Sequence, residues 1–138
     1  MMIKQISVFL ENTPGILSRF TSVLMKNNIN IRAITVAETA DFGILRMIVD
    51  RIEDCVQILR ENNYLVSVTN VLAVDIPDKP GALHDIAEIL GEHEINIEYI
   101  YSSIAKNEAV IIFRVGEIEK ALKILKDKDI KLLGSNEF

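Results

Sequence analysis

The sequence predicts an α+β protein of two ferredoxin-like βαββαβ modules in tandem, with antiparallel sheets that carry their helices on one face. Two observations support this prediction. Shifted by 66 residues, the sequence matches itself without a gap, and 14 of the 60 positions from Val8 to Ser67 are identical. Apolar residues also alternate or recur at helical spacing in the same order in both copies. We therefore expect one module over residues 1–69 and a second over 70–138.

The first copy begins with a strand from Ile3 to Leu10, where apolar and polar residues alternate and β-branched residues are frequent. A helix is expected next, because Pro14 suits a first helical position and apolar residues follow at helical spacing. The remaining elements are expected as strands Ile29 to Glu38 and Gly43 to Asp50 with a turn at Thr39 to Phe42, a helix around Ile52 to Leu59, and a strand from Tyr64 to Val68.

The second copy repeats this order. Its elements are expected as a strand from Val71 to Ile76, a helix from Pro80 to His93, strands Asn96 to Ala105 and Ala109 to Val115, a helix from Glu117 to Lys128, and a strand from Ile130 to Leu133. The segment from Ala109 to Phe113 is apolar at every position, whereas a sheet with one wet face would alternate. We therefore expect the helix-free face to be covered by the other module or by a second chain, which predicts a homodimer.

Composition excludes several function classes. The net charge is −5, with 7 basic and 7 acidic residues before residue 71 and 8 and 13 after it, so no basic face is expected for nucleic acid or anionic lipid. Cys55 is the single cysteine, which excludes an internal disulfide and a cysteine-clustered zinc site. The first residues lack the pattern of a signal peptide, and no apolar run reaches the roughly 20 residues of a membrane span. A cytoplasmic protein is expected.

The loop around Pro14 and Gly15 is suited to a ligand. A helix start leaves backbone N–H groups unpaired at a positive dipole end, where a carboxylate can dock. Gly15 lets a ligand approach the backbone closely, and Asn12 and Asn30 offer both donors and acceptors. The alternative is purely structural: Asn12 or Thr13 caps the helix, Pro14 starts it, and Asn30 holds a turn.

The motif Asn12-Thr-Pro-Gly15-Ile-Leu17 followed by Asn30-Ile31 has a counterpart in Asp78-Lys-Pro-Gly81-Ala-Leu83 followed by Asn96-Ile97. This repeat resembles the ACT domain, a small regulatory module that typically binds amino acids at module interfaces, and the resemblance covers the whole chain as two such domains. It implies a ligand site made by Asn12, Thr13, Pro14, Gly15, Ile16, Leu17, Asn30 and Ile31, with second-copy equivalents Asp78, Gly81, Ala82, Leu83 and Asn96.

The second loop departs from the first, because Asp78 stands where the first copy has Asn12. An ionised Asp repels a ligand carboxylate, although it can accept a hydrogen bond from an amino group. Prolines at 77 and 80 also stiffen this loop. We therefore expect the first copy to be the binding half.

The resemblance implies a free-standing regulatory module that binds an amino-acid effector and controls a separate enzyme of amino-acid metabolism. The alternatives are a structural or protein-interaction module without ligand, and an enzyme on the same fold. For catalysis the sequence offers no nucleophile with an evident base, and its two histidines are far apart in the pattern. A metal carrier would need paired cysteines, and an RNA-binding sheet would need stacking aromatics. No catalytic residue, cofactor, metal, nucleic acid or membrane is expected.

Overall fold

The computed structural model describes residues 2–38, 41–103 and 109–137. Residue contacts divide the chain into two compact units: Lys4–Thr69, and the segment from Asn70 onward together with the first residues through Ile3. Part of the expected turn at Thr39 to Phe42, and the last two residues of the strand expected to reach Ala105, lie outside the described residues.

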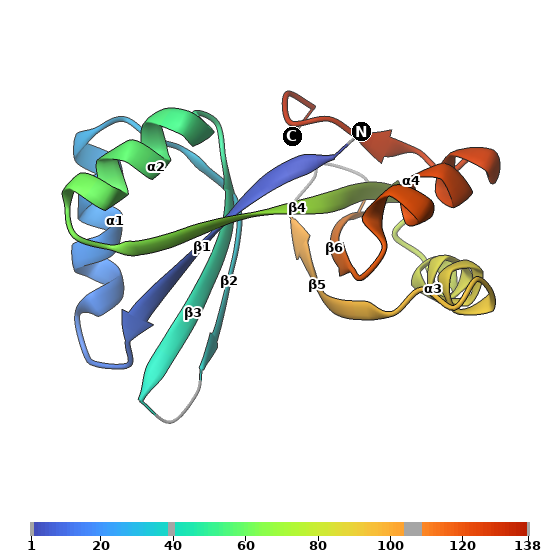
Figure 1. Ribbon diagram of the computed structural model, residues 1–138, viewed down its shortest axis with the longest axis horizontal. Coiled ribbons are helices and arrows are strands. Elements are labelled where there is room, and N and C mark those ends of the chain that lie inside the picture. The colour runs from blue at the N-terminus through green and yellow to red at the C-terminus, as the bar shows by residue number, and fades with distance from the viewer. Residues whose placement is uncertain (1, 39–40, 104–108, 138) are drawn as a thin grey trace. The chain divides into compact units, whose positions relative to one another are not determined.

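The first unit contains an antiparallel sheet whose strands are ordered β2-β3-β1-β4, with α1 and α2 on one side of it (Figure 1). Its elements are β1 (Ile3–Glu11), α1 (Ile16–Lys26), β2 (Ile31–Glu38), β3 (Phe42–Val49), α2 (Ile52–Glu61) and the first part of β4 (Leu65–Ile76). Strand β2 ends the order and pairs only with β3 among the described residues.

The second unit repeats this arrangement with the strand order β7-β4-β6-β5 (Figure 1). Its elements after β4 are α3 (Ala82–Glu92), β5 (Ile97–Ser103), β6 (Ala109–Val115), α4 (Ile118–Asp127) and the short β7 (Leu132–Leu133). The two βαββαβ units confirm the predicted α+β fold of tandem ferredoxin-like modules.

Unusual backbone conformations occur at equivalent positions of the two modules. Positive φ angles occur at Asn28 and Glu94, which are equivalent positions, and again at Asn63 and Asp129. The pairing of β2 with β3 is irregular between Ile31 and Ala33, and that of β5 with β6 is irregular between Ile97 and Tyr99. Each copy therefore has the same strand irregularity and a left-handed residue after each of its two helices.

Strand β4 corrects one prediction. The sequence predicts two strands, Tyr64 to Val68 and Val71 to Ile76, but the structure has one strand of 12 residues that includes Thr69 and Asn70. The segment between the two expected strands is only Thr69-Asn70. It contains no Gly or Pro, and β-branched Thr69 favours a strand, so Asn70 alone does not break the strand.

Each unit has its own hydrophobic core between its helices and its sheet. The first is built around Ile6, Val8, Phe20, Leu24, Leu45, Met47 and Leu59, and the second around Leu72, Val74, Ile86, Leu90, Phe113, Ala121 and Leu125. In the first core, the rings of Phe20 and Tyr64 meet edge to face with centroids 5.3 Å apart. Most of the apolar residues that recur at helical spacing in the sequence are ones that the helices contribute to these cores.

Apolar side chains on the opposite faces of the sheets are buried as well. They include Ile48 in β3 and Val110 and Ile112 in β6, none of which belongs to either core. Among the described residues, no helix is long and apolar enough to cross a bilayer.

Candidate functional site

The first loop forms a tight turn, not the start of a helix. The Ile16 N–H donates to the Thr13 carbonyl at 3.3 Å, and Gly15 has φ 83° and ψ −7°. These are the features of a type II β-turn with Pro14 at its second position and Gly at its third, where a positive φ is required. The first helical hydrogen bond then runs from the Arg19 N–H to the Gly15 carbonyl at 3.1 Å.

This turn corrects the prediction that Pro14 begins the helix under a cap from Asn12 or Thr13. The helix starts at Ile16, its cap is Gly15, and no side chain caps it. The reason is the left-handed Gly15, which separates Pro14 from the helix by one residue. Among the described residues, the backbone N–H groups of Leu17 and Ser18 therefore have no hydrogen-bond partner. The turn residues are exposed, so these donors lie at an open helix start.

Asn12 ties this turn to the neighbouring strands. Its side-chain Nδ2 donates to Glu38 Oε2 at 3.2 Å, and its backbone N–H donates to the Asp41 carbonyl at 3.1 Å. The carboxylate of Glu38, at the end of β2, therefore lies beside the turn. The sequence does not predict the contact of Glu38 with Asn12, because 26 residues separate the two and no local motif links them.

Asn30 lies just before β2, not within it as the sequence predicts. Its N–H donates to Asp50 Oδ1 at 3.1 Å, and its carbonyl accepts from the Asp50 N–H at 3.2 Å. These bonds fix the backbone and leave the exposed carboxamide of Asn30 without a partner among the described residues. Asn28, held in a left-handed conformation, likewise has an exposed carboxamide with no partner there.

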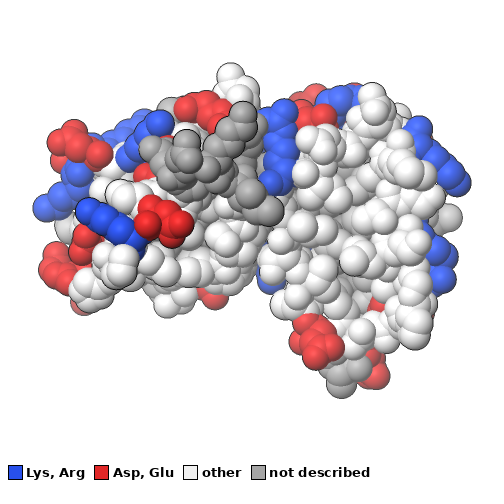
Figure 2. All heavy atoms as spheres, turned by 180° about the vertical axis from the view of Figure 1, so that it is seen from behind, with Lys and Arg blue, Asp and Glu red and all other residues white. Residues whose placement is uncertain are grey.

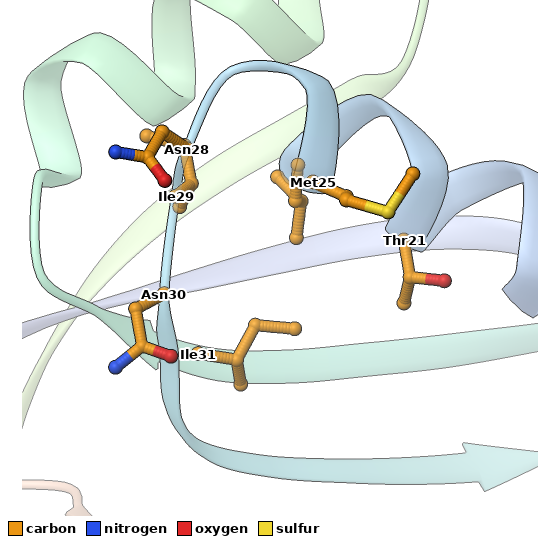
Figure 3. A pocket seen from close by; sticks show the side chains of 7 residues that line it. Thr21, Met25, Asn28, Ile29, Asn30 and Ile31 are labelled. Carbon is orange, nitrogen blue, oxygen red and sulfur yellow. The ribbon is translucent and has the colours of Figure 1, made fainter.

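An open groove of about 430 Å³ runs between the second half of α1 and the start of β2. Figure 3 shows the carboxamides of Asn28 and Asn30 on the segment that leads into β2, with Met25 and Thr21 on the helix beyond. The apolar part of the lining includes the buried Ile29 and the half-buried Ile31. The groove therefore combines two uncommitted carboxamides with an apolar wall.

Within one module the two halves of the predicted site are far apart. Asn12 contacts Glu38 at the far end of β2, whereas Asn30 precedes its first residue. Strand β2 has eight residues, which corresponds to about 26 Å. The structure thus groups Asn12, Thr13, Pro14, Gly15, Ile16 and Leu17 at one end, and Asn30 and Ile31 at the other.

The second copy has the same turn in a different chemical setting. The Ala82 N–H donates to the Lys79 carbonyl at 3.3 Å, and Gly81 has φ 92° and ψ −18°. Asp78 and Leu83 are exposed and Ala82 is buried. Asn96 again precedes a strand, and its carbonyl accepts from the Gly116 N–H at 3.2 Å, without a side chain in the place of Asp50.

A hollow of about 310 Å³ lies beside the second turn. Its charged lining comprises Asp75, Lys79, Asp85, Asp129 and Lys131. Lys131 Nζ is 3.2 Å from Asp75 Oδ2, and the other carboxylate oxygen of Asp75 is buried without a hydrogen bond. The hollow therefore combines three carboxylates with two lysines, one of which is paired with Asp75.

Cys55, His84 and His93 are the thiol and imidazole side chains of this protein. Burial, with a smaller contribution from Asp50, raises the pKa of the Cys55 thiol to about 11, which keeps it protonated at neutral pH. His84 contacts Glu88 at 2.8 Å and His93 donates to the Ile89 carbonyl at 2.8 Å, at opposite ends of α3. Across residues 2–38, 41–103 and 109–137, no three His, Cys, Asp or Glu side chains are placed to hold a metal ion.

Several solved structures share the fold of this chain. It is 41% identical to a protein from Bacteroides thetaiotaomicron, with a TM-score of 0.92 over 96% of this chain and 92% of that one. The regulatory subunit of aspartate kinase from Thermus thermophilus, solved in a ligand-free form, has a TM-score of 0.64 at 15% identity, over 90% of each chain.

The aspartate kinase of Clostridium acetobutylicum, described as an allosteric enzyme, has a TM-score of 0.61 at 13% identity; the match covers 91% of this chain and 33% of the kinase. No curated protein sequence matches the chain. The family model for the ACT domain pair matches residues 1–138. The chain therefore belongs to the ACT domain pair family.

Proposed function

We propose that this protein is a free-standing regulatory module that binds an amino acid and controls a separate enzyme of amino-acid metabolism, without catalysing a reaction itself. Membership of the ACT domain pair family over the whole chain supports this proposal. Two similar structures also support the proposal. One is the regulatory subunit of an aspartate kinase, and the other is an allosteric aspartate kinase in which the matched region covers 33% of the chain. The catalytic partner would then be another polypeptide.

The observation that carries the proposal is the groove beside Asn30. Its two carboxamides can donate to a carboxylate and accept from an ammonium group, while Met25 and Ile31 offer apolar contact to a side chain. Its volume of about 430 Å³ falls in the range of small-molecule sites. A zwitterion with a partly apolar side chain is the ligand class that matches this lining.

The exposed turn at Thr13–Ile16 supplies the second half of the proposed site. The free N–H groups of Leu17 and Ser18 lie at a helix start, where a carboxylate is favoured. This turn and Asn30 lie at opposite ends of one module. We therefore infer that the turn of one chain meets Asn30 of a second chain. That inference requires association, so the proposal includes a homodimer. It also assigns the two ACT modules to residues 1–69 and 70–138.

Thermal unfolding in the presence of each of the twenty amino acids tests the function. A ligand at a hundred times its dissociation constant adds about 2.7 kcal/mol of stability, which raises Tm measurably. We expect Asn30→Ala to abolish the shift, because it removes an uncommitted carboxamide and leaves the backbone bonds to Asp50 intact.

Asn96→Ala, the same change at the equivalent position of the second module, is the matched control and should keep the shift. If no amino acid shifts Tm, effector binding is wrong. A shift that survives Asn30→Ala but not Asn96→Ala would move the site to the second module.

A further inference from the structure

Two consecutive residues just before α2, Asp50 and Arg51, are bonded to the segment that carries the groove carboxamides. Arg51 Nη1 donates to the Asn27 carbonyl at 3.1 Å and to the Asn28 carbonyl at 3.4 Å. Asp50 Oδ1 accepts from the Asn30 N–H at 3.1 Å, and the Asp50 N–H donates to the Asn30 carbonyl at 3.2 Å. The segment 27–30, between α1 and β2, is therefore bonded to this pair at three of its four residues.

The guanidinium of Arg51 is itself held in place by α2. Its Nε and Nη2 donate to Asp54 Oδ2 at 3.1 and 2.9 Å, and Asp54 lies in the first turn of that helix. The side chains of Arg51 and Asp54 are 45% and 58% exposed, so the ion pair adds little stability by itself. Because a guanidinium is planar with its donors in a fixed arrangement, the pair directs Nη1 at the end of α1.

The backbone of the segment closes in the same way in both modules. In the first module the Ile29 N–H donates to the Leu24 carbonyl at 3.0 Å, and in the second the Ile95 N–H donates to the Leu90 carbonyl at 2.9 Å. Both are the bond that closes a helix C-terminus through a left-handed residue. The turn does not require Arg51, because the second module forms it with a glutamate at that position.

The side-chain contacts to this segment differ between the modules. Gly116 and Glu117 replace the pair in the second module. A glycine has no side chain to accept a backbone N–H, and an ionised glutamate cannot donate to carbonyl groups. Lys120 Nζ, in the first turn of α4, donates to the His93 carbonyl at 3.1 Å, so one contact at the helix end remains. The first module therefore makes contacts to this segment that the second lacks the residues to make.

The position of the segment matters because the groove has few polar groups. Among the described residues its lining contains no charged side chain, and Figure 2 shows a broad area of the first module that is likewise uncharged. The Thr21 hydroxyl already donates to helix carbonyls. A zwitterion in the groove relies on the carboxamides of Asn28 and Asn30, which lie on one short segment (Figure 3). Hydrogen bonds weaken steeply with distance and angle, so a small displacement of either carboxamide lowers affinity.

We propose that Asp50 and Arg51 are positioning residues for the effector, which hold Asn28 and Asn30 in the arrangement that the ligand requires. The inference rests on the proposed function, and it gives a physical reason for assigning the ligand to the first module. Asn96 precedes a strand as Asn30 does, but no aspartate side chain holds it.

Backbone ¹⁵N relaxation in the absence of any amino acid tests whether the pair orders the segment. In wild-type protein, order parameters of residues 27–30 should lie near the value of about 0.85 that is typical of a rigid backbone. Arg51→Met should lower them toward about 0.6, the limit below which a backbone is flexible. Lys120→Met, the matched control in α4, should leave residues 27–30 unchanged. Unchanged order parameters in Arg51→Met would overturn the proposal.

Isothermal titration with each of the twenty amino acids, singly, tests whether this order serves a ligand. For an amino acid that binds wild-type protein, Arg51→Met and Asp50→Ala should each raise the dissociation constant about tenfold, because each removes hydrogen bonds that hold a carboxamide in place. Asp50→Asn keeps an acceptor oxygen for the Asn30 N–H and should retain most of the affinity. Lys120→Met should bind as wild-type protein does.

The second module suggests a rescue. Arg51→Glu combined with Asp54→Lys reproduces the arrangement of Glu117 and Lys120, in which the lysine reaches the carbonyl at the helix end. Arg51→Glu alone should weaken binding as Arg51→Met does, and the double variant should recover part of the affinity. A double variant no better than Arg51→Glu would contradict the positioning role.

The dissociation constant separates positioning from mere stabilisation. If Arg51→Met and Asp50→Ala lower Tm but bind an amino acid as tightly as wild-type protein, the positioning role is wrong and the proposed function stands. If wild-type protein binds none of the twenty amino acids, the proposed function fails, and the positioning role fails with it.

Discussion

The two modules have the same backbone conformation but differ in several surface residues. The turn glycines, Gly15 and Gly81, and the asparagines before the second strand of each copy recur. The groove residues recur only in part: Asn30 and Ile31 correspond to Asn96 and Ile97, whereas Met25 corresponds to Gly91 and Asn28 to Glu94. The duplication has thus kept the residues at the start of each second strand and changed the groove residues on the preceding helix and in the turn after it. This difference supports our proposal that the first module carries the ligand site.

The cores give the largest expected difference between the modules. Phe20 in the first corresponds to Ile86 in the second, and both are essentially buried. We expect Phe20→Ala to lower the free energy of unfolding by about 3–5 kcal/mol and Ile86→Ala by about 2–5 kcal/mol. Only Phe20 has an aromatic partner, Tyr64, in edge-to-face contact. Urea unfolding measures both losses.

A double-mutant cycle on Phe20 and Tyr64 separates the ring contact from the cavity, with an expected coupling of about 0.5–1.5 kcal/mol. A coupling of zero would show that the aromatic pair adds nothing beyond burial, and would remove this difference between the two cores.

The turns should respond equally, because their structural role is the same. Gly15 and Gly81 have φ of 83° and 92°, where a Cβ is disfavoured in any L-residue. Gly15→Ala and Gly81→Ala should each cost about 1–2 kcal/mol. The added methyl of Gly81→Ala meets nothing within 4 Å, and that of Gly15→Ala meets only the end of the flexible Arg19 side chain. A much larger loss at one site, measured by thermal unfolding, would show that the turns are not equivalent.

A pH dependence from a buried cysteine is expected in the first module and not in the second. Burial raises the pKa of Cys55 in the folded chain to about 11, above its ordinary value of 9.0. A group whose folded pKa is raised favours the folded state below its unfolded pKa, and this contribution disappears as the pH rises from 9 toward 11. The second module has Ala121 at this position. The stability of Cys55→Ala relative to wild type should therefore increase over that range in urea titrations.

Sequence periodicity predicted the repeat, the order of elements and the helical stripes, because burial on one face leaves a pattern in each segment. It failed where one backbone angle decides the local structure. A Pro-Gly pair fits both a helix start and a type II turn, and only the φ of Gly15 distinguishes them. Asn70 is a residue type that favours turns, but no Gly or Pro accompanies it and β4 continues through it.

The sequence names the residues of the candidate site but does not predict how they are arranged. Asn12 and Asn30 lie on elements that any βαββ unit places at opposite ends of its second strand, and local motifs carry no information on that separation. The contact from Asn12 to Glu38 spans 26 residues, and the groove at Asn28 depends on a left-handed residue between helix and strand. Neither leaves a signal in a single sequence.

Amide chemical-shift mapping tests the central claim most directly. The labelled protein would be titrated with the amino acid that gives the largest thermal shift. The account predicts perturbations at residues 12–18 and 28–31 together, because both ends of β2 would contact one ligand across two copies. Perturbations confined to 78–84 and 94–97, or to one end of the first module alone, would contradict it.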